Sequence, residues 1–289
     1  MELFILNLLN GISFGCILFL VGSGLSLTFG VMGVLNLAHG AIYVIGGYVG
    51  WTVAVKNGWN YWLAVLSGGF VAGLIGLILE RGFFRYLHRR INEQVLLTFG
   101  IIYILTNLSL WIWGAAPKPP FIAPILSGSF HLVGDWSYSI ARVAIIFIGI
   151  ALAIGLWWLQ EKTRIGAIIR AGMDDKEMTV GLGVNYELVA TGVFCLGCFI
   201  AGASGVIGAY LFGLTHELGL EILLLALVVV IVGGTGSIQG ALLGGVLIGL
   251  IISFGKALFP DLSMFLSYIA MLVILLVKPS GLLGRKTLR

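Results

Sequence analysis

The sequence predicts an all-α integral membrane protein with about eight or nine transmembrane helices, some of them broken by glycine-rich segments. Of the 289 residues, 60% are hydrophobic and only 10% are charged, and the mean hydropathy is +1.11. Globular proteins carry roughly 25% charged residues, so a soluble fold does not fit this composition. Apolar runs of about 20 residues, long enough to cross roughly 30 Å of hydrocarbon, recur along the whole chain.

The individual elements follow from the polar breaks between the apolar runs. We expect membrane spans at residues 3–29, 36–54, 60–80, 94–113, 141–159, 187–211, 220–234, 238–256 and 263–279. The first run lacks the basic start of a cleavable signal peptide and should remain as a span. The glycine-rich stretches 30–36 and 233–240 are either loops or discontinuities within one broken helix. Residues 1–289 should form a single transmembrane domain.

Lysine and arginine predict the orientation of the spans, because loops rich in these residues stay in the cytoplasm. Twelve of the sixteen basic residues fall on one side of the expected spans and four on the other. The richer side holds Arg81, Arg85, Arg89, Arg90, Lys162, Arg164, Arg170, Lys176, Lys278, Arg285, Lys286 and Arg289. The poorer side holds Lys56, Lys118, Arg142 and Lys256. We therefore expect a cytoplasmic C-terminus and, from the number of spans, an external N-terminus.

The connections between spans are short, apart from an external loop at about residues 114–140. This loop holds four of the six prolines and is too interrupted to cross the membrane, so we expect an external cap. No connection is long enough to fold alone as a catalytic or receptor domain. Many of the 43 glycines recur at small-xxx-small spacing, which predicts close helix packing. The pairs are Gly11/Gly15, Gly69/Gly73, Gly240/Gly244 and Gly245/Gly249.

Several kinds of chemistry lack the residues that they need. Every Asp and Glu lies in a loop or near the end of a span, which argues against a carboxylate deep in the membrane and against ion-coupled transport. His39 has no second metal ligand at helical spacing. The stretch 249–257 approaches a phosphate-binding loop but has one residue too many and ends in Ala257 instead of Ser or Thr. We expect no catalytic residue, no metal and no cofactor in this chain.

The candidate substrate pathway lies at the two glycine-rich breaks. His39, with Asn36 beside it, lies between two apolar stretches, where a polar side chain either lines a pathway or bonds to a backbone carbonyl for packing. The sequence leaves both alternatives open. The pathway candidates are Asn36, His39, Gly40 and Ala41 at the first break, and Gly233, Gly234, Thr235, Gly236, Ser237 and Gln239 at the second.

The cytoplasmic loop at about residues 160–186 predicts two short helices. Ile165, Ile168, Ile169 and Met173 recur at helical spacing. A second helix should then open with Asp174 as its cap and Glu177 reaching back. A short capped helix here suits a partner's groove, and a solvated connector is the alternative. The residues that we assign to this element are Arg170, Asp174, Asp175, Glu177, Met178, Gly181 and Gly183, and the two glycines can end the helix.

Four motifs resemble one known family along nearly the whole chain. They are NGISFGCILFLVGSGLSLTFGVMGVLNLAHGAIYVIGGYV (10–49), RIGAIIRAGMDDKEMTVGLGVN (164–185), VVVIVGGTGSIQGALLGGVLIGL (228–250) and KPSGLLGR (278–285). Together they resemble the permease subunit of bacterial branched-chain amino acid ABC importers, the first of that system's two homologous permeases. Many relatives carry an acid directly after the His-Gly pair of the first motif, where this chain has Ala41.

The resemblance implies a multi-pass permease of the bacterial inner membrane. Its partners would be a homologous second permease, two cytoplasmic ATPase subunits that hold ATP and magnesium, and a periplasmic substrate-binding protein. The loop of residues 164–185 is similar to the family segment that contacts the ATPase. The cargo would be a branched-chain amino acid or a related small amino acid, amide, urea or organic acid. The alternatives are a passive channel and an ion-coupled secondary transporter of a small polar solute.

Overall fold

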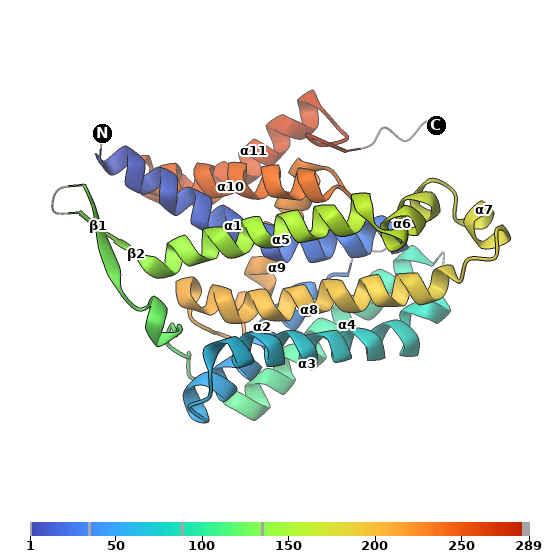
Figure 1. Cartoon of the computed structure of the whole chain (residues 1–289), viewed down its shortest axis with the longest axis horizontal. Helices are drawn as coiled ribbons and strands as arrows, with labels where there is room; N and C mark the ends of the chain where they lie inside the picture. The colour runs from blue at the N-terminus through green and yellow to red at the C-terminus, as the bar shows by residue number, and fades with distance from the viewer. Residues whose placement is uncertain (1, 34–35, 88–89, 134–135, 285–289) are drawn as a thin grey trace.

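The computed structural model is a bundle of long helices that run side by side (Figure 1). The structure describes residues 2–33, 36–87, 90–133 and 136–284. The α-helices are α1 (Glu2–Met32), α2 (His39–Trp51), α3 (Tyr61–Gly82), α4 (Ile91–Trp113), α5 (Ile140–Lys162), α6 (Arg164–Asp174), α7 (Lys176–Gly181), α8 (Tyr186–Phe212), α9 (Leu218–Gly233), α10 (Ile238–Leu258) and α11 (Ser263–Val277). The shorter elements are the π-helix η1 (Thr52–Lys56), the 3-10 helices η2 (Phe84–Leu87), η3 (Pro124–Leu126) and η4 (Pro260–Leu262), and the strands β1 (Ser129–Val133) and β2 (Trp136–Ser139).

The all-α membrane class is confirmed. Six helices (α1, α3, α4, α5, α8 and α10) are long and apolar enough to cross a bilayer, while α9 and α11 are shorter apolar helices. α2 has 13 residues. Each of the nine expected spans therefore corresponds to a helix. The break around residues 30–36 separates α1 from α2, and the break around 233–240 is the turn between α9 and α10.

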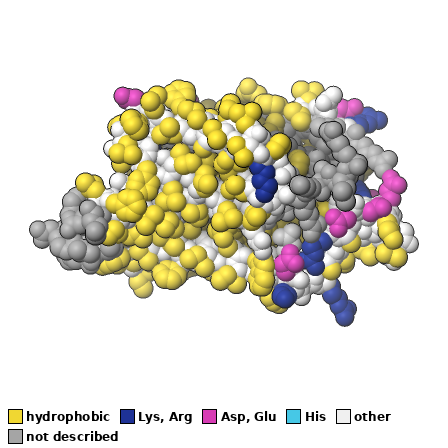
Figure 2. Space-filling view, turned by 90° about the horizontal axis from the view of Figure 1, so that it is seen from above, with side chains coloured by type: hydrophobic (Ala, Val, Ile, Leu, Met, Phe, Trp, Pro, Cys, Tyr) yellow, Lys and Arg dark blue, Asp and Glu magenta, His cyan; other side chains and the backbone are white. Residues whose placement is uncertain are grey.

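The two ends of the bundle differ in charge. β1 and β2 form an antiparallel hairpin at one end, which we call the hairpin end, and the N-terminus lies there (Figure 1). α6 and α7 lie at the other end, which we call the α6–α7 end. Figure 2 shows a side that is mostly hydrophobic, with charged side chains gathered mainly toward the α6–α7 end. Arg89, Arg285, Lys286 and Arg289 of the expected basic side lie outside the described residues.

The expected glycine contacts include one pair of motifs that face each other. A Cβ atom on Gly15 of α1 would lie 2.6 Å from the carbonyl oxygen of Gly245 in α10, and one on Gly245 would lie 2.8 Å from the carbonyl oxygen of Gly15. Gly11 lies against Gly249 and Leu250 in the same interface. Small residues allow the two backbones to approach this closely. Helices in lipid depend on such packing, because the hydrophobic effect does not drive their association there.

The 114–140 connection contains no helix long enough to span, as the sequence predicts, but it holds the β1–β2 hairpin, which the sequence pattern did not indicate. Before the hairpin, Lys118 forms a backbone bridge with Leu214, with N–O distances of 2.9 and 3.0 Å. This bridge ties the connection to the segment that joins α8 to α9. The hairpin end therefore holds the chain where it turns back into the bundle after α8.

The C-terminal segment is packed against the end of α9. The amide nitrogens of Leu282 and Leu283 donate to the carbonyl oxygens of Val232 and Gly233 at 2.8 and 2.9 Å. These carbonyls lie in the last turn of α9 and would otherwise lack a helical donor. Two motifs that are far apart in the sequence, at 228–250 and 278–285, therefore meet at the α6–α7 end.

Candidate functional site

The helix α2 begins deep inside the bundle. His39, its first residue, is fully buried, and its Nε2 lies 3.2 Å from the carbonyl oxygen of Val21 in α1. About two turns later, Gly46 packs against Gly202 of α8. α8 is the most buried of the six long apolar helices. α2 therefore starts beside the middle of the two central helices instead of at the membrane surface.

The helix α9 begins at the same depth. The carbonyl oxygen of Gly219 occupies the space that a Cβ atom on Gly40 would need. In the other direction, a Cβ on Gly219 would lie 3.1 Å from the Gly40 carbonyl oxygen. The first turns of α2 and α9 thus touch through two glycines. Two short helices begin side by side in the interior of the bundle.

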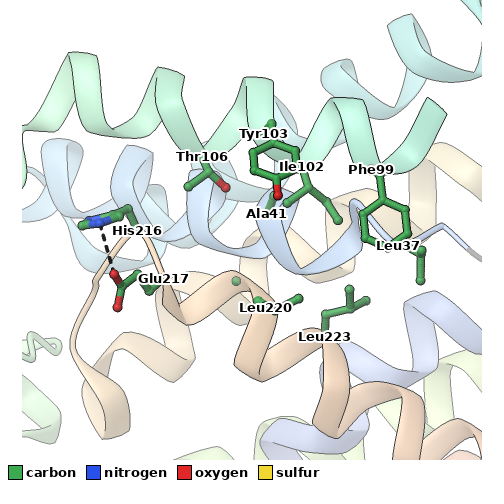
Figure 3. Close-up of a pocket in the computed structure, with 11 residues that line it drawn as sticks. Leu37, Ala41, Phe99, Ile102, Tyr103, Thr106, His216, Glu217, Leu220 and Leu223 are labelled. Atoms are coloured by element: carbon green, nitrogen blue, oxygen red, sulfur yellow. Dashed lines mark ion pairs between the residues drawn. The ribbon is translucent and has the colours of Figure 1, made fainter. Parts of the chain in front are cut away.

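A pocket of about 250 Å³ lies beside this contact (Figure 3). Its walls come from the start of α2, the middle of α4 and the start of α9. The lining residues are Leu37, Ala41, Phe99, Ile102, Tyr103, Thr106, His216, Glu217, Gly219, Leu220 and Leu223. Most of the lining is aliphatic or aromatic, and the polar atoms gather at the end formed by His216 and Glu217.

Glu217 brings a carboxylate to the depth of this pocket. Its Oε1 lies 3.8 Å from Nε2 of His216, drawn as a dashed line in Figure 3. It shares the pocket with Tyr103 and Thr106, which lie in the middle of the candidate span 92–113. Glu217 lies in the turn before α9, in a loop as the sequence predicts, but this turn is level with the middle of α4 and not with its end. The sequence places Glu217 just before an apolar run, and only the fold shows that this run starts deep in the bundle.

The predicted residues of the first break divide between the pocket and the packing around it. Ala41 lines the pocket. His39 is directed to α1, where a Cβ on Gly24 would lie 3.1 Å from its ring atoms Cε1 and Nε2. Asn36 is buried, and its Oδ1 accepts a hydrogen bond from the Ala38 amide at 3.1 Å. Neither Asn36 Nδ2 nor His39 Nδ1 has a hydrogen-bond partner among the described residues.

The predicted residues of the second break lie elsewhere. Gly233, Gly234, Thr235, Gly236, Ser237 and Gln239 form the end of α9, the turn after it and the start of α10. Ser237 caps α10, because its Oγ accepts from the Gly240 amide at 3.0 Å. Gly234 packs against Gly281 and Gly284 of the C-terminal segment. The structure does not bring this cluster together with the pocket, which lies at the other end of α9.

The turn after α9 instead meets the loop helices. A Cβ on Gly236 would lie 2.8 Å from Cε of Met173 in α6, and one on Gly30 of α1 would lie 3.2 Å from the same atom. Gly236 has a φ of +77°, a conformation that favours glycine. The Met173 side chain thus fills a notch between the end of α1 and the turn that joins α9 to α10. A displacement of α6 would therefore push Met173 directly against that turn.

The predicted pair of loop helices is confirmed, with one correction to its register. α6 continues through Asp174, and the cap of α7 is Asp175, whose Oδ1 accepts from the Met178 amide at 2.9 Å. With this cap, Glu177 is the second helical residue and not the third that a capping box requires. Gly181 is the last residue of α7, and Gly183 takes the left-handed conformation with φ +83°. Arg170 pairs with Glu161 at 3.5 Å.

Sequence reasoning missed most of the pocket. The pocket residues of α4 lie in an apolar run, and their residue types do not distinguish them from those that face lipid. They are Phe99, Ile102, Tyr103 and Thr106. His216, Leu220 and Leu223 likewise carry no motif. The one available signal is the adjacent His216–Glu217 pair between two apolar stretches, since ionisable residues near membrane depth are usually functional.

Comparison with known proteins identifies the family. The family described as "Branched-chain amino acid transport system / permease component" matches residues 7–275. The chain belongs to this family. It is 28% identical to the high-affinity branched-chain amino acid transport system permease protein BraD of Pseudomonas aeruginosa, over 96% of this chain and 95% of BraD. It is 27% identical to the corresponding LivH protein of Escherichia coli K12, over 98% and 96% of the two chains.

A more distant likeness extends to an archaeal protein and to a solved structure. The permease is 26% identical to a probable LivH protein of Methanocaldococcus jannaschii, over 95% of this chain and 91% of that protein. Its fold resembles PsaBC from Streptococcus pneumoniae, solved in complex with Fab, with a TM-score of 0.50 and 12% identity. The match covers 96% of the permease and 91% of the PsaBC chain. This likeness concerns the fold alone. The permease is thus a multi-pass membrane transport component.

Proposed function

We propose that this permease carries branched-chain amino acids, or related small amino acids, amides or organic acids, through the bacterial inner membrane as part of an ABC importer. The observation that carries the proposal is the pocket at the start of α2 and α9. Secondary transporters place their substrate sites near the bilayer midplane at discontinuous helices, and α2 and α9 provide helix starts of the same kind inside this bundle. The family membership and the relatives' names support an amino-acid cargo.

The chemistry of the pocket suits a zwitterion with an aliphatic side chain. Ala41, Ile102, Leu220 and Leu223 supply an apolar wall. The carboxylate of Glu217 can attract an ammonium group at the polar end. The starts of α2 and α9 add partial positive charge that favours a carboxylate. Ala41, where many relatives carry an acid, leaves more room and less negative charge on the α2 wall.

The open side of the pocket supports a second permease as a partner. The side chain of Glu217 is 87% exposed, and Tyr103 and Leu220 are 69% and 55% exposed. A carboxylate at this depth is costly against lipid and normally faces a bundle interior or a water-filled cavity. A homologous second permease placed over α4 and α9 would enclose the pathway between the two subunits.

Energy would come from other chains. We assign ATP and magnesium to two cytoplasmic ATPase subunits that press on α6 and α7, and cargo delivery to a periplasmic binding protein. Closure of the ATPases would move Met173 against the Gly236 turn and thereby shift α9, whose other end lines the pocket. In this proposal the α6–α7 end and the C-terminus lie in the cytoplasm, and the excess of basic residues on that side supports this orientation.

The test is a substitution that fills the pocket in the complete importer. In proteoliposomes with the ATPases, the second permease and the binding protein, Ala41→Phe should strongly reduce ATP-driven leucine uptake, while the subunits still copurify. Ala41→Gly, which adds no volume, is the matched control and should transport. Full uptake by Ala41→Phe would place the pathway elsewhere.

Two changes to this preparation distinguish the alternatives. A passive channel would carry solute through vesicles that hold this permease without ATPases. An ion-coupled carrier would stop when an uncoupler collapses the proton gradient at constant ATP. The presence of Glu217 at depth makes this second control necessary, because a deep carboxylate is the group that such a carrier uses.

A further inference from the structure

A second cavity, of about 390 Å³, lies near the hairpin end, on a different side of the bundle from the pathway pocket. It is formed by the start of α1, the start of α5, and the ends of α8 and α10. Its lining residues are Asn7, Asn10, Phe14, Arg142, Leu211, Phe212, Ile252, Ser253, Lys256 and Ala257. It shares no residue with the pathway pocket, and nothing in the proposed transport route uses it.

Two of the four basic residues of this end converge on the cavity. Arg142 is half-buried in the first turn of α5, and its Nη1 donates to Oδ1 of Asn10 at 2.7 Å. Lys256 is exposed in the last turn of α10, with Nζ 5.9 Å from the centre of the Phe14 ring. No Asp or Glu is among the lining residues that the structure describes. The cavity therefore has a net positive charge and no carboxylate to balance it.

Ordinary snorkelling explains only part of this arrangement. A lysine near a helix end often extends its ammonium group toward the headgroups, and the exposed side chain of Lys256 can do so. Arg142 differs, because Asn10 fixes its guanidinium inside the cavity instead of letting it extend to water. Ser253 donates to the Asn7 carbonyl at 2.7 Å and joins α10 to α1 on the same side of the cavity. Fixed N–H donors of this kind match the geometry of phosphate or carboxylate oxygens.

The surroundings of the cavity indicate where such an anion would come from. The outer ends of α1 and α10 expose Leu3, Phe4, Leu258 and Phe259, with exposed fractions of 57–68%. These side chains belong in hydrocarbon and adjoin the level at which headgroups lie. An anion that carries acyl chains could place its charge beside Arg142 and Lys256 and its chains along these residues.

We propose that this cavity binds the headgroup phosphate of an anionic phospholipid in the outer leaflet. The Arg142 guanidinium and the side-chain Nδ2 of Asn10 donate to the phosphate oxygens. Lys256 closes the site at the membrane surface. A lipid bound there would bridge α1, α5 and α10 next to the hairpin.

The test uses the full-length permease in detergent and two probes that share either the chains or the phosphate with the proposed ligand. Native mass spectrometry should show that the permease retains dioctanoyl-phosphatidylglycerol. It should retain dioctanoylglycerol, which lacks the phosphate, only weakly. Inorganic phosphate should not displace the bound phosphatidylglycerol. Arg142→Gln should weaken phosphatidylglycerol binding about tenfold, because a charge-assisted bond is lost, and Lys256→Gln should weaken it several-fold. Lys56→Gln, an exposed cation of the same end outside the cavity, should bind as the wild type.

Lys256→Gln also guards against misfolding, because Lys256 is exposed and its replacement leaves the Arg142–Asn10 bond intact. Equal binding of phosphatidylglycerol and dioctanoylglycerol, or wild-type affinity in both variants, would overturn the proposal. Displacement of the lipid by inorganic phosphate would overturn the lipid as the source of the anion. If the Arg142→Gln and Lys256→Gln variants bind the lipid normally but no longer bind the periplasmic receptor, the two cations contact the receptor and not a lipid.

Discussion

Gly40 and Gly219 are in backbone contact at the point where α2 and α9 begin: the Gly219 carbonyl leaves no room for a side chain on Gly40, and a Cβ on Gly219 would lie only 3.1 Å from the Gly40 carbonyl oxygen. This contact sets the depth of both helices. Because α9 begins there, Glu217 and Leu220 lie opposite Tyr103 of α4, and the pocket exists between them. The contact is therefore as important for the proposed pathway as any residue that lines it.

Gly40→Ala should separate α2 from α9. The new methyl group overlaps the Gly219 carbonyl, and overpacking of this kind costs about 1–3 kcal/mol. We expect a lower unfolding temperature in detergent and a loss of uptake in the assembled importer. Gly192→Ala is the matched control, because among the described residues no atom beyond the adjacent turns of its own helix lies within 4 Å of a Cβ at Gly192. That helix position should gain roughly 0.5–1 kcal/mol from the replacement of glycine. Equal behaviour of the two variants would show that the contact carries no strain.

His39→Ala should reduce stability without changing the range of substrates. The imidazole is buried against Gly24 and bonds to the Val21 carbonyl, so its removal leaves a void in the α1–α2 interface. Truncation of a large buried side chain costs about 2–5 kcal/mol. Thermal unfolding and competition uptake with several amino acids measure the two effects separately. A changed substrate range at wild-type stability would instead make His39 a pathway residue.

Met173→Ala should uncouple ATP hydrolysis from uptake. The shortened side chain no longer fills the notch between Gly30 and Gly236, so movement of α6 is transmitted poorly to α9. The number of leucine molecules imported per ATP hydrolysed should fall, while the subunits remain assembled. Met173→Leu keeps most of the volume and should cost less than about 1.5 kcal/mol. Wild-type coupling in Met173→Ala would exclude this contact from the transmission route.

Asp175→Ala should loosen α7. The variant loses the bond from the Met178 amide, and removal of such a cap costs about 1 kcal/mol. Hydrogen exchange of the α7 amides should become roughly fivefold faster, and ATPase binding should weaken. Asp175→Asn keeps an accepting oxygen and should retain both properties. Faster exchange in Asp174→Ala but not in Asp175→Ala would restore the cap to Asp174.

The sequence by itself determined the class of fold and much of the helix packing. Apolar runs in lipid must satisfy their own backbone hydrogen bonds, so each expected span became a helix. The pairs Gly11/Gly15 and Gly245/Gly249 were recognisable because small residues four apart lie on one side of a helix, although nothing in the sequence said that they face each other. The helical spacing of Ile165, Ile169 and Met173 likewise predicted α6, because that helix borders water and must be amphipathic.

Only the tertiary structure decided which residues form the pocket. A membrane helix is apolar on every side, so periodicity cannot distinguish the Tyr103 side of α4 from the sides that meet lipid. The depth of Glu217 was also hidden, because sequence shows where an apolar run begins along the chain and not where it begins in the membrane. That depth follows from the Gly40–Gly219 contact, which joins two residues far apart in the chain through backbone packing alone.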